Sequence, residues 1–229
     1  MAPPFIEPAT PPAATRRSVS EVAAALREGI TAGAYQPNER LVEEHLASIL
    51  GTNRAVVRGA LALLQQEGLV VRERHRGARV RAIGVEEAVE ILEARAALDG
   101  VVARRAAERM TDEHARVLTA LLEQMRAKLE AGELLAYSEV NARFHRTIRT
   151  LAAHATSEKL LALLQSQAVR YQFRTVLRPG RPTESLAEHT AILDALLARD
   201  PDAAERAARR HVAGVIDAVR TIAALRLHS

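Results

Sequence analysis

The sequence contains no cysteine and no tryptophan, and only 3% of its 229 residues are aromatic. Without cysteine the chain has neither a disulfide framework nor a thiolate metal site, a composition that fits the reducing cytoplasm. So few aromatic side chains argue against base stacking on single-stranded nucleic acid as the main mode of binding. No apolar run approaches the roughly 18 residues that a membrane span needs, so we expect no membrane partner.

There is also no large excess of one charge, because 32 Lys and Arg oppose 28 Asp and Glu and leave a net charge of +4. Five of the 9 prolines lie within residues 1–17, a density that blocks helix and sheet, and we expect a disordered tail there. The remaining length suffices for two modest domains, each with its own core. We predict one domain over residues 18–83 and a second over residues 84–229.

The clearest local signal lies in residues 51–68, which read GTNRAVVRGALALLQQEG. A glycine turn, with Thr52 or Asn53 as the N-cap, precedes apolar residues at helical spacing, namely Val56, Val57, Ala60, Leu61 and Leu64. We therefore predict a short, half-buried helix. Arg54 and Arg58 are four residues apart and project from one face near its N-terminus, the end that enters the major groove in helix-turn-helix proteins.

The flanking segments favour DNA binding over an ordinary amphipathic helix. Residues 41–50 repeat the helical period and are separated from the next helix by little more than Gly51, which predicts a helix-turn-helix unit. Residues 69–81 form two β-rich runs around a basic turn, the pattern of a β-hairpin wing. Between residues 51 and 81 seven arginines oppose two glutamates, a balance of +5. The positive charge is thus concentrated where a winged helix would meet phosphates.

Residues 20–80 resemble the winged helix of the GntR family of bacterial transcription regulators, through the segments LA at 46–47, GTNRAVVRGAL at 51–61, EGLV at 67–70 and RGA at 76–78. Three positions depart from the usual pattern: Asn38 replaces glycine, Asn53 replaces Ser or Thr, and Gly59 replaces Glu. The resemblance implies binding to an inverted repeat in double-stranded DNA. The residues expected to contact DNA are Thr52, Asn53, Arg54, Arg58, His75, Arg76 and Gly77.

From residue 85 onward there is hardly a strand signal, and the pattern predicts an all-α bundle of about six helices. The predicted segments are 85–109, 112–131, 133–153, 156–177, 183–199 and 201–227. Thr111, Thr156 and Thr183 are predicted N-caps, and Pro201 suits the first turn of the last helix. The whole chain is therefore expected to be mainly α, with a small β-hairpin in the N-terminal domain.

Three of the eight histidines, His145, His189 and His211, fall on the inward faces of predicted helices. His189 and His211 each lie 11 residues from Asp200, so an antiparallel hairpin around that turn would place both rings at the same height. A single inward histidine is ordinarily a core imidazole bonded to a backbone carbonyl. Burying three without a shared partner costs free energy at each ring, which favours a divalent metal ion, zinc or nickel foremost. Asn141, four residues before His145, could add a weak oxygen ligand.

Residues 85–227 resemble the FCD effector domain of the FadR subfamily, through SLAEH at 185–189, ILDA at 192–195 and RHV at 210–212. In metal-binding members the ligands come from a D..FH motif and two later histidines, positions that correspond here to Asn141, His145, His189 and His211. An Asn in place of the usual Asp leaves such a site with one less negative charge. The resemblance also implies that Arg95 binds the carboxylate of the effector. From the residues alone, an inward Arg95 needs either such an anion or a structural ion pair.

We therefore expect a cytoplasmic, homodimeric transcription regulator, a repressor as is usual in the family, whose DNA binding responds to a small organic acid bound beside a metal ion. Two alternatives remain open at this point. A three-histidine metal site can also activate water in an enzyme, although no HExxH motif supplies a general base and an enzyme has no need of a basic wing. The histidines could instead be structural, in a constitutive DNA binder.

Overall fold

The computed structural model describes residues 17–73, 77–176 and 178–226 of the chain. The predicted tail, residues 1–17, lies outside the described residues except for Arg17. Contacts divide the chain into two compact units, residues 1–81 and residues 82–229. The fold is mainly α with a small antiparallel sheet, as the sequence predicts.

The first unit contains three helices and three short strands in the described residues. In chain order these are α1 (Val19–Ala32), β1 (Arg40–Leu41), α2 (Glu43–Ile49), α3 (Arg54–Gln66), β2 (Val70–Glu73) and β3 (Gly77–Val80). β3 lies in the middle of the sheet and pairs antiparallel with both β1 and β2. Leu26 of α1, Leu46 of α2 and Leu61 of α3 are nearly inaccessible to solvent and form one core with the inward side chains of the sheet.

Local signals set the ends of these helices. Ser18 and Glu21 form a capping box at the start of α1, and Gly33, with φ of 85°, ends the helix where the sequence predicts. At α3 the Asn53 side chain accepts a hydrogen bond from the Val56 amide at 3.1 Å, so Asn53 rather than Thr52 is the N-cap. The prediction was wrong at Leu41, which belongs to β1 and not to the following helix. That strand forms only through pairing with β3, which lies some 38 residues further along the chain. Local periodicity cannot predict a pairing over such a distance.

Two of the departures from the family pattern have a structural reason. Asn38 has a φ of 66°, a left-handed conformation that asparagine tolerates better than most residues, and it therefore replaces a glycine at little cost. Gly59 faces α1, and a Cβ at this position would lie 3.1 Å from both γ carbons of Val19. The glycine therefore permits a close crossing of α1 and α3.

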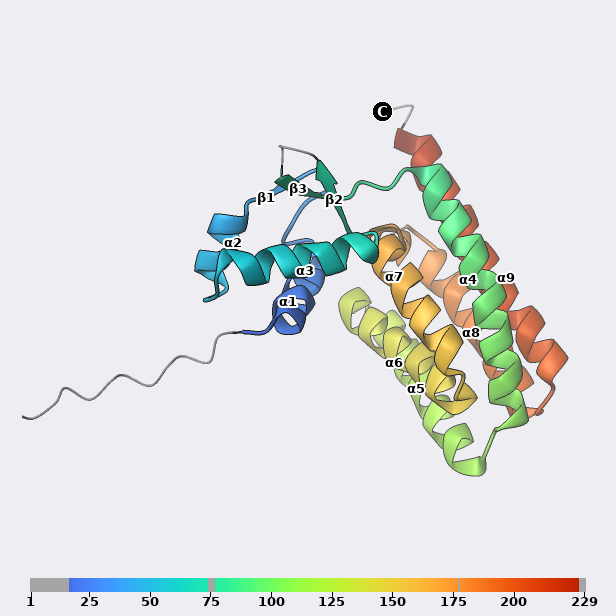
Figure 1. The fold of residues 1–229 in the computed structure, drawn as a ribbon. Coiled ribbons are helices and arrows are strands. Elements are labelled where there is room, and N and C mark those ends of the chain that lie inside the picture. The colour runs from blue at the N-terminus through green and yellow to red at the C-terminus, as the bar shows by residue number, and fades with distance from the viewer. Residues whose placement is uncertain (1–16, 74–76, 177, 227–229) are drawn as a thin grey trace, which may run out of the picture. The chain divides into compact units, whose positions relative to one another are not determined.

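The second unit contains six helices in the described residues. They are α4 (Val85–Glu108), α5 (Asp112–Glu130), α6 (Leu134–Ala152), α7 (Ala155–Val176), α8 (Arg181–Leu197) and α9 (Pro201–Arg226). α4 and α9 lie side by side along much of their length (Figure 1). No helix of the described residues is long and apolar enough to cross a membrane.

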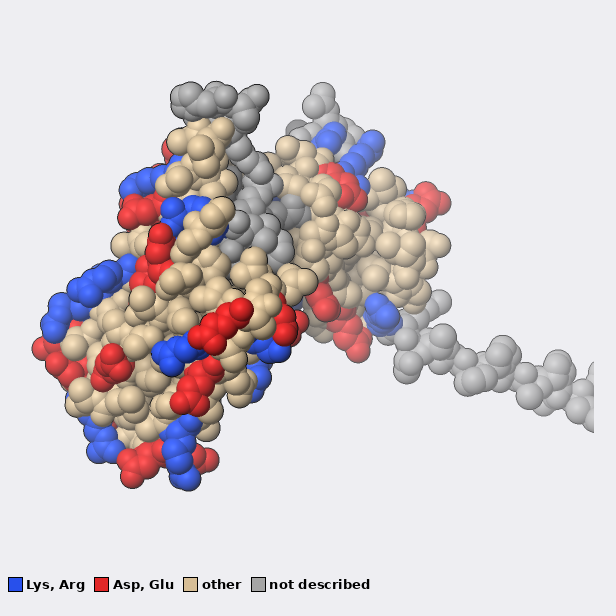
Figure 2. Space-filling model, turned by 180° about the vertical axis from the view of Figure 1, so that it is seen from behind, with Lys and Arg blue, Asp and Glu red and all other residues tan. Residues whose placement is uncertain are grey.

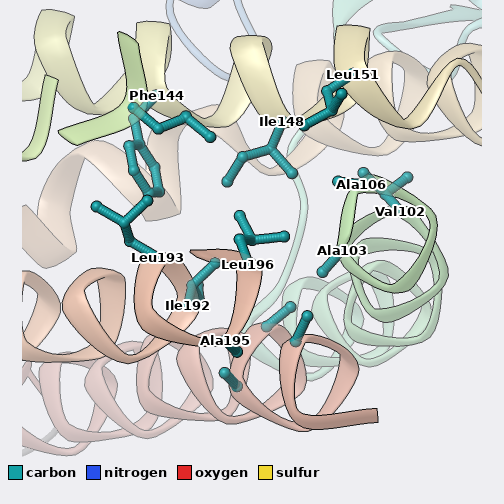
Figure 3. Close-up of a cluster of buried hydrophobic side chains, with 14 of the residues drawn as sticks. Val102, Ala103, Ala106, Phe144, Ile148, Leu151, Ile192, Leu193, Ala195 and Leu196 are labelled. Carbon is teal, nitrogen blue, oxygen red and sulfur yellow. The ribbon is translucent and has the colours of Figure 1, made fainter. Parts of the chain in front are cut away.

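The main core of this unit lies between α4, α6 and α8, whose apolar side chains point toward one another (Figure 3). Phe144 of α6 is completely buried there. Its ring meets the ring of His189 edge to face, with centroids 5.4 Å apart. Truncation of a buried phenylalanine costs about 3–5 kcal/mol, so this core holds α6 firmly in place beside α8.

The predicted N-caps of the helical unit have mixed outcomes. Thr111 caps α5 through the amide of His114, as expected. Thr156 does not cap α7, because the helix begins one residue earlier and the His154 ring accepts the Ser157 amide at 3.1 Å. Thr183 does not cap α8 either, because the helix begins at Arg181, directly after Gly180 with φ of 81°. The helix starts without a side-chain cap, and Pro182 in its first turn has no backbone N–H that would need one.

Candidate metal centre and nucleic-acid interface

The N-terminus of α3 presents two arginines with different surroundings. Arg54 is exposed. Arg58 donates to the Glu43 carboxylate from Nη2 at 2.9 Å and from Nε at 3.2 Å, and Arg72 of β2 lies 4.0 Å from the same carboxylate. The hydrogen bond from Arg58 lowers the pKa of Glu43 despite partial burial. Both arginines lie near the N-terminal end of the helix, as predicted, but Arg58 already has an acidic partner.

The remaining residues expected to contact DNA surround this helix end or the wing. The Thr52 hydroxyl is buried and has no hydrogen-bond partner among the described residues. Asn53 uses its amide oxygen as the N-cap, which leaves its amide nitrogen for another contact. Gly77 begins β3 with φ of 85°, a value that favours glycine. His75 and Arg76 lie outside the described residues.

Three helices bring His145, His189 and His211 together in the second unit. One ring nitrogen of each lies within 4.8 Å of the others, so the three form a group that could hold a metal ion. His189 on α8 is fully buried, and His211 on α9 is 7% exposed. The two rings have centroids 4.4 Å apart, which confirms the contact predicted from their equal distance to Asp200.

The protonation of the cluster is set by burial. The Nε2 atoms of His145 and His189 lie 2.9 Å apart, a separation that requires a proton or a cation between them. Burial, followed by the neighbouring imidazoles, holds the pKa of both rings well below 6.5. Both are therefore neutral at neutral pH, which is the state that binds a metal ion.

A buried ion pair orients the third ring. His211 Nδ1 lies 2.7 Å from a carboxylate oxygen of Glu188, which can only accept, so Nδ1 carries the hydrogen and Nε2 keeps its lone pair. Arg181, only 2% exposed, donates two hydrogen bonds to the same carboxylate at 2.9 and 2.8 Å. Burial raises the pKa of Glu188, but the hydrogen bonds from His211 and Arg181 outweigh this and lower it.

Gly214 on α9 makes room for this ion pair. A Cβ at this position would lie 2.3 Å from a carboxylate oxygen of Glu188 and 3.2 Å from Nη2 of Arg181. Glycine within a helix costs about 1 kcal/mol relative to alanine. Here the missing side chain lets the carboxylate of α8 pass close to the backbone of α9.

A cavity of about 290 Å³ adjoins the cluster and is lined by His145, His211, Arg95 and Asn141 among others. Arg95 is 9% exposed and donates to Asp99 at 3.1 Å, but its buried Nε has no partner among the described residues. Within the same part of the chain the buried amide oxygen of Asn141 also lacks one. Asn141 and Arg95 therefore lie where the sequence places them, beside the histidines, and each retains an unused polar atom.

Comparisons with known proteins place both units in known families. Residues 18–80 match the bacterial regulatory proteins of the gntR family, and residues 90–214 match the FCD domain. A probable D-xylose utilization operon transcriptional repressor of Paenarthrobacter nicotinovorans is 33% identical over 181 residues, 77% of each chain. The chain belongs to the GntR family. The HTH-type transcriptional repressor RspR of Escherichia coli K12 is 28% identical over 86% of each chain.

A solved structure is also similar to this chain in three dimensions. Escherichia coli McbR/YncC has a TM-score of 0.69 to this chain at 23% identity, over 92% of this chain and 97% of that one. At this identity the match supports the fold alone. The matched families and relatives are transcriptional regulators, so this GntR-family protein is a regulator and not the metal-dependent enzyme considered as an alternative.

Sequence reasoning missed the residues that support the histidines of this GntR-family protein. Glu188 directly precedes His189, and Arg181 lies seven residues, or two helical turns, before Glu188. That spacing places both charges on one face of α8 and could have indicated the pair. Nothing in the sequence around Gly214 indicates that its missing side chain serves a carboxylate of another helix.

We predict that Gly214→Ala destabilises the protein, although the same change in a helix ordinarily stabilises by up to about 1 kcal/mol. The added methyl group collides with the Glu188 carboxylate, and such overpacking costs about 1–3 kcal/mol. Urea denaturation measures the change. In a Glu188→Ala background the collision is absent, so Gly214→Ala should then be stabilising or neutral. Equal effects in both backgrounds would show that the glycine does not serve the ion pair.

We also predict that the metal-free protein loses stability as the pH falls below about 6.5. The folded-state pKa values of His145 and His189 are depressed, so below that pH the unfolded chain binds protons that the folded chain does not. Stability should fall by up to about 1.4 kcal/mol per pH unit for each ring. Urea denaturation between about pH 7.5 and about pH 5.5 tests this.

The matched variants for the pH series are His145→Gln and His45→Gln. The first removes a half-buried imidazole and should reduce the slope, whereas the second removes an exposed ring and should not. A flat profile for the wild-type protein would contradict the assignment of neutral, buried histidines.

Proposed function

We propose that this protein is a cytoplasmic transcriptional repressor that binds an inverted repeat in double-stranded DNA as a homodimer, and that a small organic acid in the FCD domain changes its affinity for that operator. Both matched relatives described above are named as repressors. The +5 balance between residues 51 and 81 supports attraction to phosphates. A two-fold dimer would match the symmetry of an inverted repeat.

At the DNA interface we assign base contacts to Arg54 and Arg58, with Thr52, Asn53 and the wing residues His75, Arg76 and Gly77 as neighbouring contacts. Arg54 is exposed and directly usable. Arg58 must either leave Glu43 or be shared between that carboxylate and the DNA. The amide nitrogen of the exposed Asn53 is a donor of the kind that binds phosphate or base edges, whereas the Thr52 hydroxyl is buried and would have to turn outward to do so.

In the FCD domain we assign a divalent ion, zinc or nickel, to His145, His189 and His211, with Asn141 as a further oxygen donor. The observation that carries this assignment is the approach of three ring nitrogens to within 4.8 Å beside a cavity. The neutral state of His145 and His189, the orientation of His211 by Glu188 and the buried Asn141 oxygen, which has no partner among the described residues, all fit an ion. Such an ion, when bound, supplies a positive centre for an oxygen ligand.

We assign the effector to the adjoining cavity and its carboxylate to Arg95. The Nε of this arginine is buried without a partner, and a carboxylate would accept its hydrogen. A ligand in the cavity would contact α4, α6 and α8 at once, because Arg95, His145 and Ser185 all line it. It can change operator affinity only by binding one arrangement of the dimer more tightly than another.

We predict that Arg54→Ala weakens specific DNA binding by about 1–3 kcal/mol, the usual contribution of a base-reading arginine. The operator is first selected from random double-stranded DNA, and affinity is then measured by fluorescence anisotropy at fixed salt. The selected sequences should form an inverted repeat. Arg126→Ala on α5 removes the same charge from an exposed site of the other unit and serves as the control.

Two outcomes would contradict the DNA-binding proposal. Unchanged affinity in Arg54→Ala, with its circular dichroism spectrum intact, would rule out the assigned interface. Selection of a single half-site, bound by a monomer at full strength, would rule out the dimer.

We predict that the protein binds about one equivalent of zinc or nickel and that a chelator lowers its melting temperature, by an amount set by the affinity and free concentration of the ion. His189→Ala and His211→Ala should abolish stoichiometric binding, whereas the exposed-ring variant His45→Ala should not. Metal analysis and thermal melting test this. A wild-type protein that binds neither ion and melts at one temperature with and without chelator would show that the three histidines are core residues and that an effector, if any, is held without a metal.

A further inference from the structure

The cavity beside the histidines is lined by charge of one sign. Among the described residues, its lining contains the arginines Arg95, Arg146, Arg149 and Arg181 and no Asp or Glu. The outer surface of the same unit differs, because Figure 2 shows acidic and basic side chains mixed over it. A cavity with only positive side chains is a site for an anion.

Two of these four charges are already matched by the protein. Arg181 donates twice to Glu188, and Arg95 donates once to Asp99. Arg146 and Arg149 of α6 have no ion pair or hydrogen bond from their side chains within the described part of the chain. Arg149 is half-buried, and burial lowers its pKa, while the charges of Asp99 and Glu158 oppose that shift only in part. Removing a guanidinium from water without supplying an acceptor costs free energy, which a ligand would recover.

The unmatched charge lies one turn from the candidate metal ligand. Asn141, His145 and Arg149 are spaced by four residues on α6, and all three line the cavity. His145 and Arg149 are thus separated by about 6 Å along the helix axis. Arg95 and Arg149 both lower the pKa of His145, so both charges act on the same ring.

We propose that the ligand of this cavity carries two anionic groups about one helical turn apart, the first at the three histidines and Arg95, and the second held by Arg149 with Arg146. This rests on the proposed carboxylate-sensing function and specifies its ligand class as a dicarboxylate or a phosphorylated acid. Imidazole and amide ligands leave the charge of a divalent ion uncompensated. Arg146 and Arg149, which form no ion pair within the described residues, add to that positive charge. A single carboxylate would leave most of that charge unmatched, whereas a dianion offsets it at both ends.

The test compares acids that differ only in the second anionic group. Isothermal titration of the full-length, zinc-loaded protein with butyrate and succinate should show at least about tenfold tighter binding of succinate, as expected for one added charge-assisted contact. In the same way, glutarate is compared with pentanoate, and 3-phosphoglycerate with glycerate. These two comparisons distinguish a dicarboxylate ligand from a phosphorylated one.

Arg149→Gln should weaken each diacid much more than its monoacid and reduce the preference to about twofold, because the second anionic group loses its main partner. Arg149→Lys keeps the charge and should retain part of the preference. Arg143→Gln on the same helix changes an exposed arginine that does not line the cavity, and it should retain the full preference.

The outcomes separate this proposal from the one on which it rests. Equal binding of mono- and dianionic acids by the wild-type protein would overturn the second anion site and leave carboxylate sensing intact. The same result follows if Arg149→Gln folds and keeps the preference for diacids. If no acid in the series binds, both the dianion site and the carboxylate effector are overturned, whereas the DNA-binding assignment is unaffected.

Discussion

The arrangement of the three histidines depends on a buried ion pair between Arg181 and Glu188 of α8. Two charges with little exposure are stable there only because each satisfies the other and the carboxylate also accepts from His211. Removing either residue would leave the other charge without its main partner. Because Glu188 also accepts a hydrogen bond from His211, the pair links the start of α8 to the middle of α9. Gly214 permits the approach, since any side chain there would occupy the space of the carboxylate.

Charge is used differently in the two units. At α3 the arginines are on the surface, where Arg58 and Arg72 share the Glu43 carboxylate, and such exposed pairs contribute little to stability and can exchange partners. Around the FCD cavity Arg95 and Arg181 are buried and Arg149 is half-buried, whereas Arg146 is exposed. Arg95 and Arg149 can neither lose their charge at physiological pH nor recover their hydration, so they favour an anion. A surface suited to phosphates and a cavity suited to a small acid are what a ligand-responsive DNA-binding protein needs.

Much of the candidate site could be predicted because its signals are local. The inward positions of His145, His189 and His211 follow from helical periodicity, and the contact between the last two follows from their equal distance to Asp200. Asn53 and Thr111 were recognisable as N-caps from residue type and position. The caps at Thr156 and Thr183 were wrong because the His154 ring, two residues before Thr156, caps α7, and because α8 starts after Gly180, three residues before Thr183, without a side-chain cap.

By itself the sequence determined the helical pattern, the winged helix with its concentration of arginines, and the presence of three inward histidines, because each depends on residues within a few turns of one another. Only the tertiary structure decided which charges meet across different helices. Glu43 pairs with Arg58, Glu188 binds His211, and Arg149 is left facing the cavity. Ion pairs can form between any nearby opposite charges, and several of these meet across different helices, so only the packing of those helices selects among them.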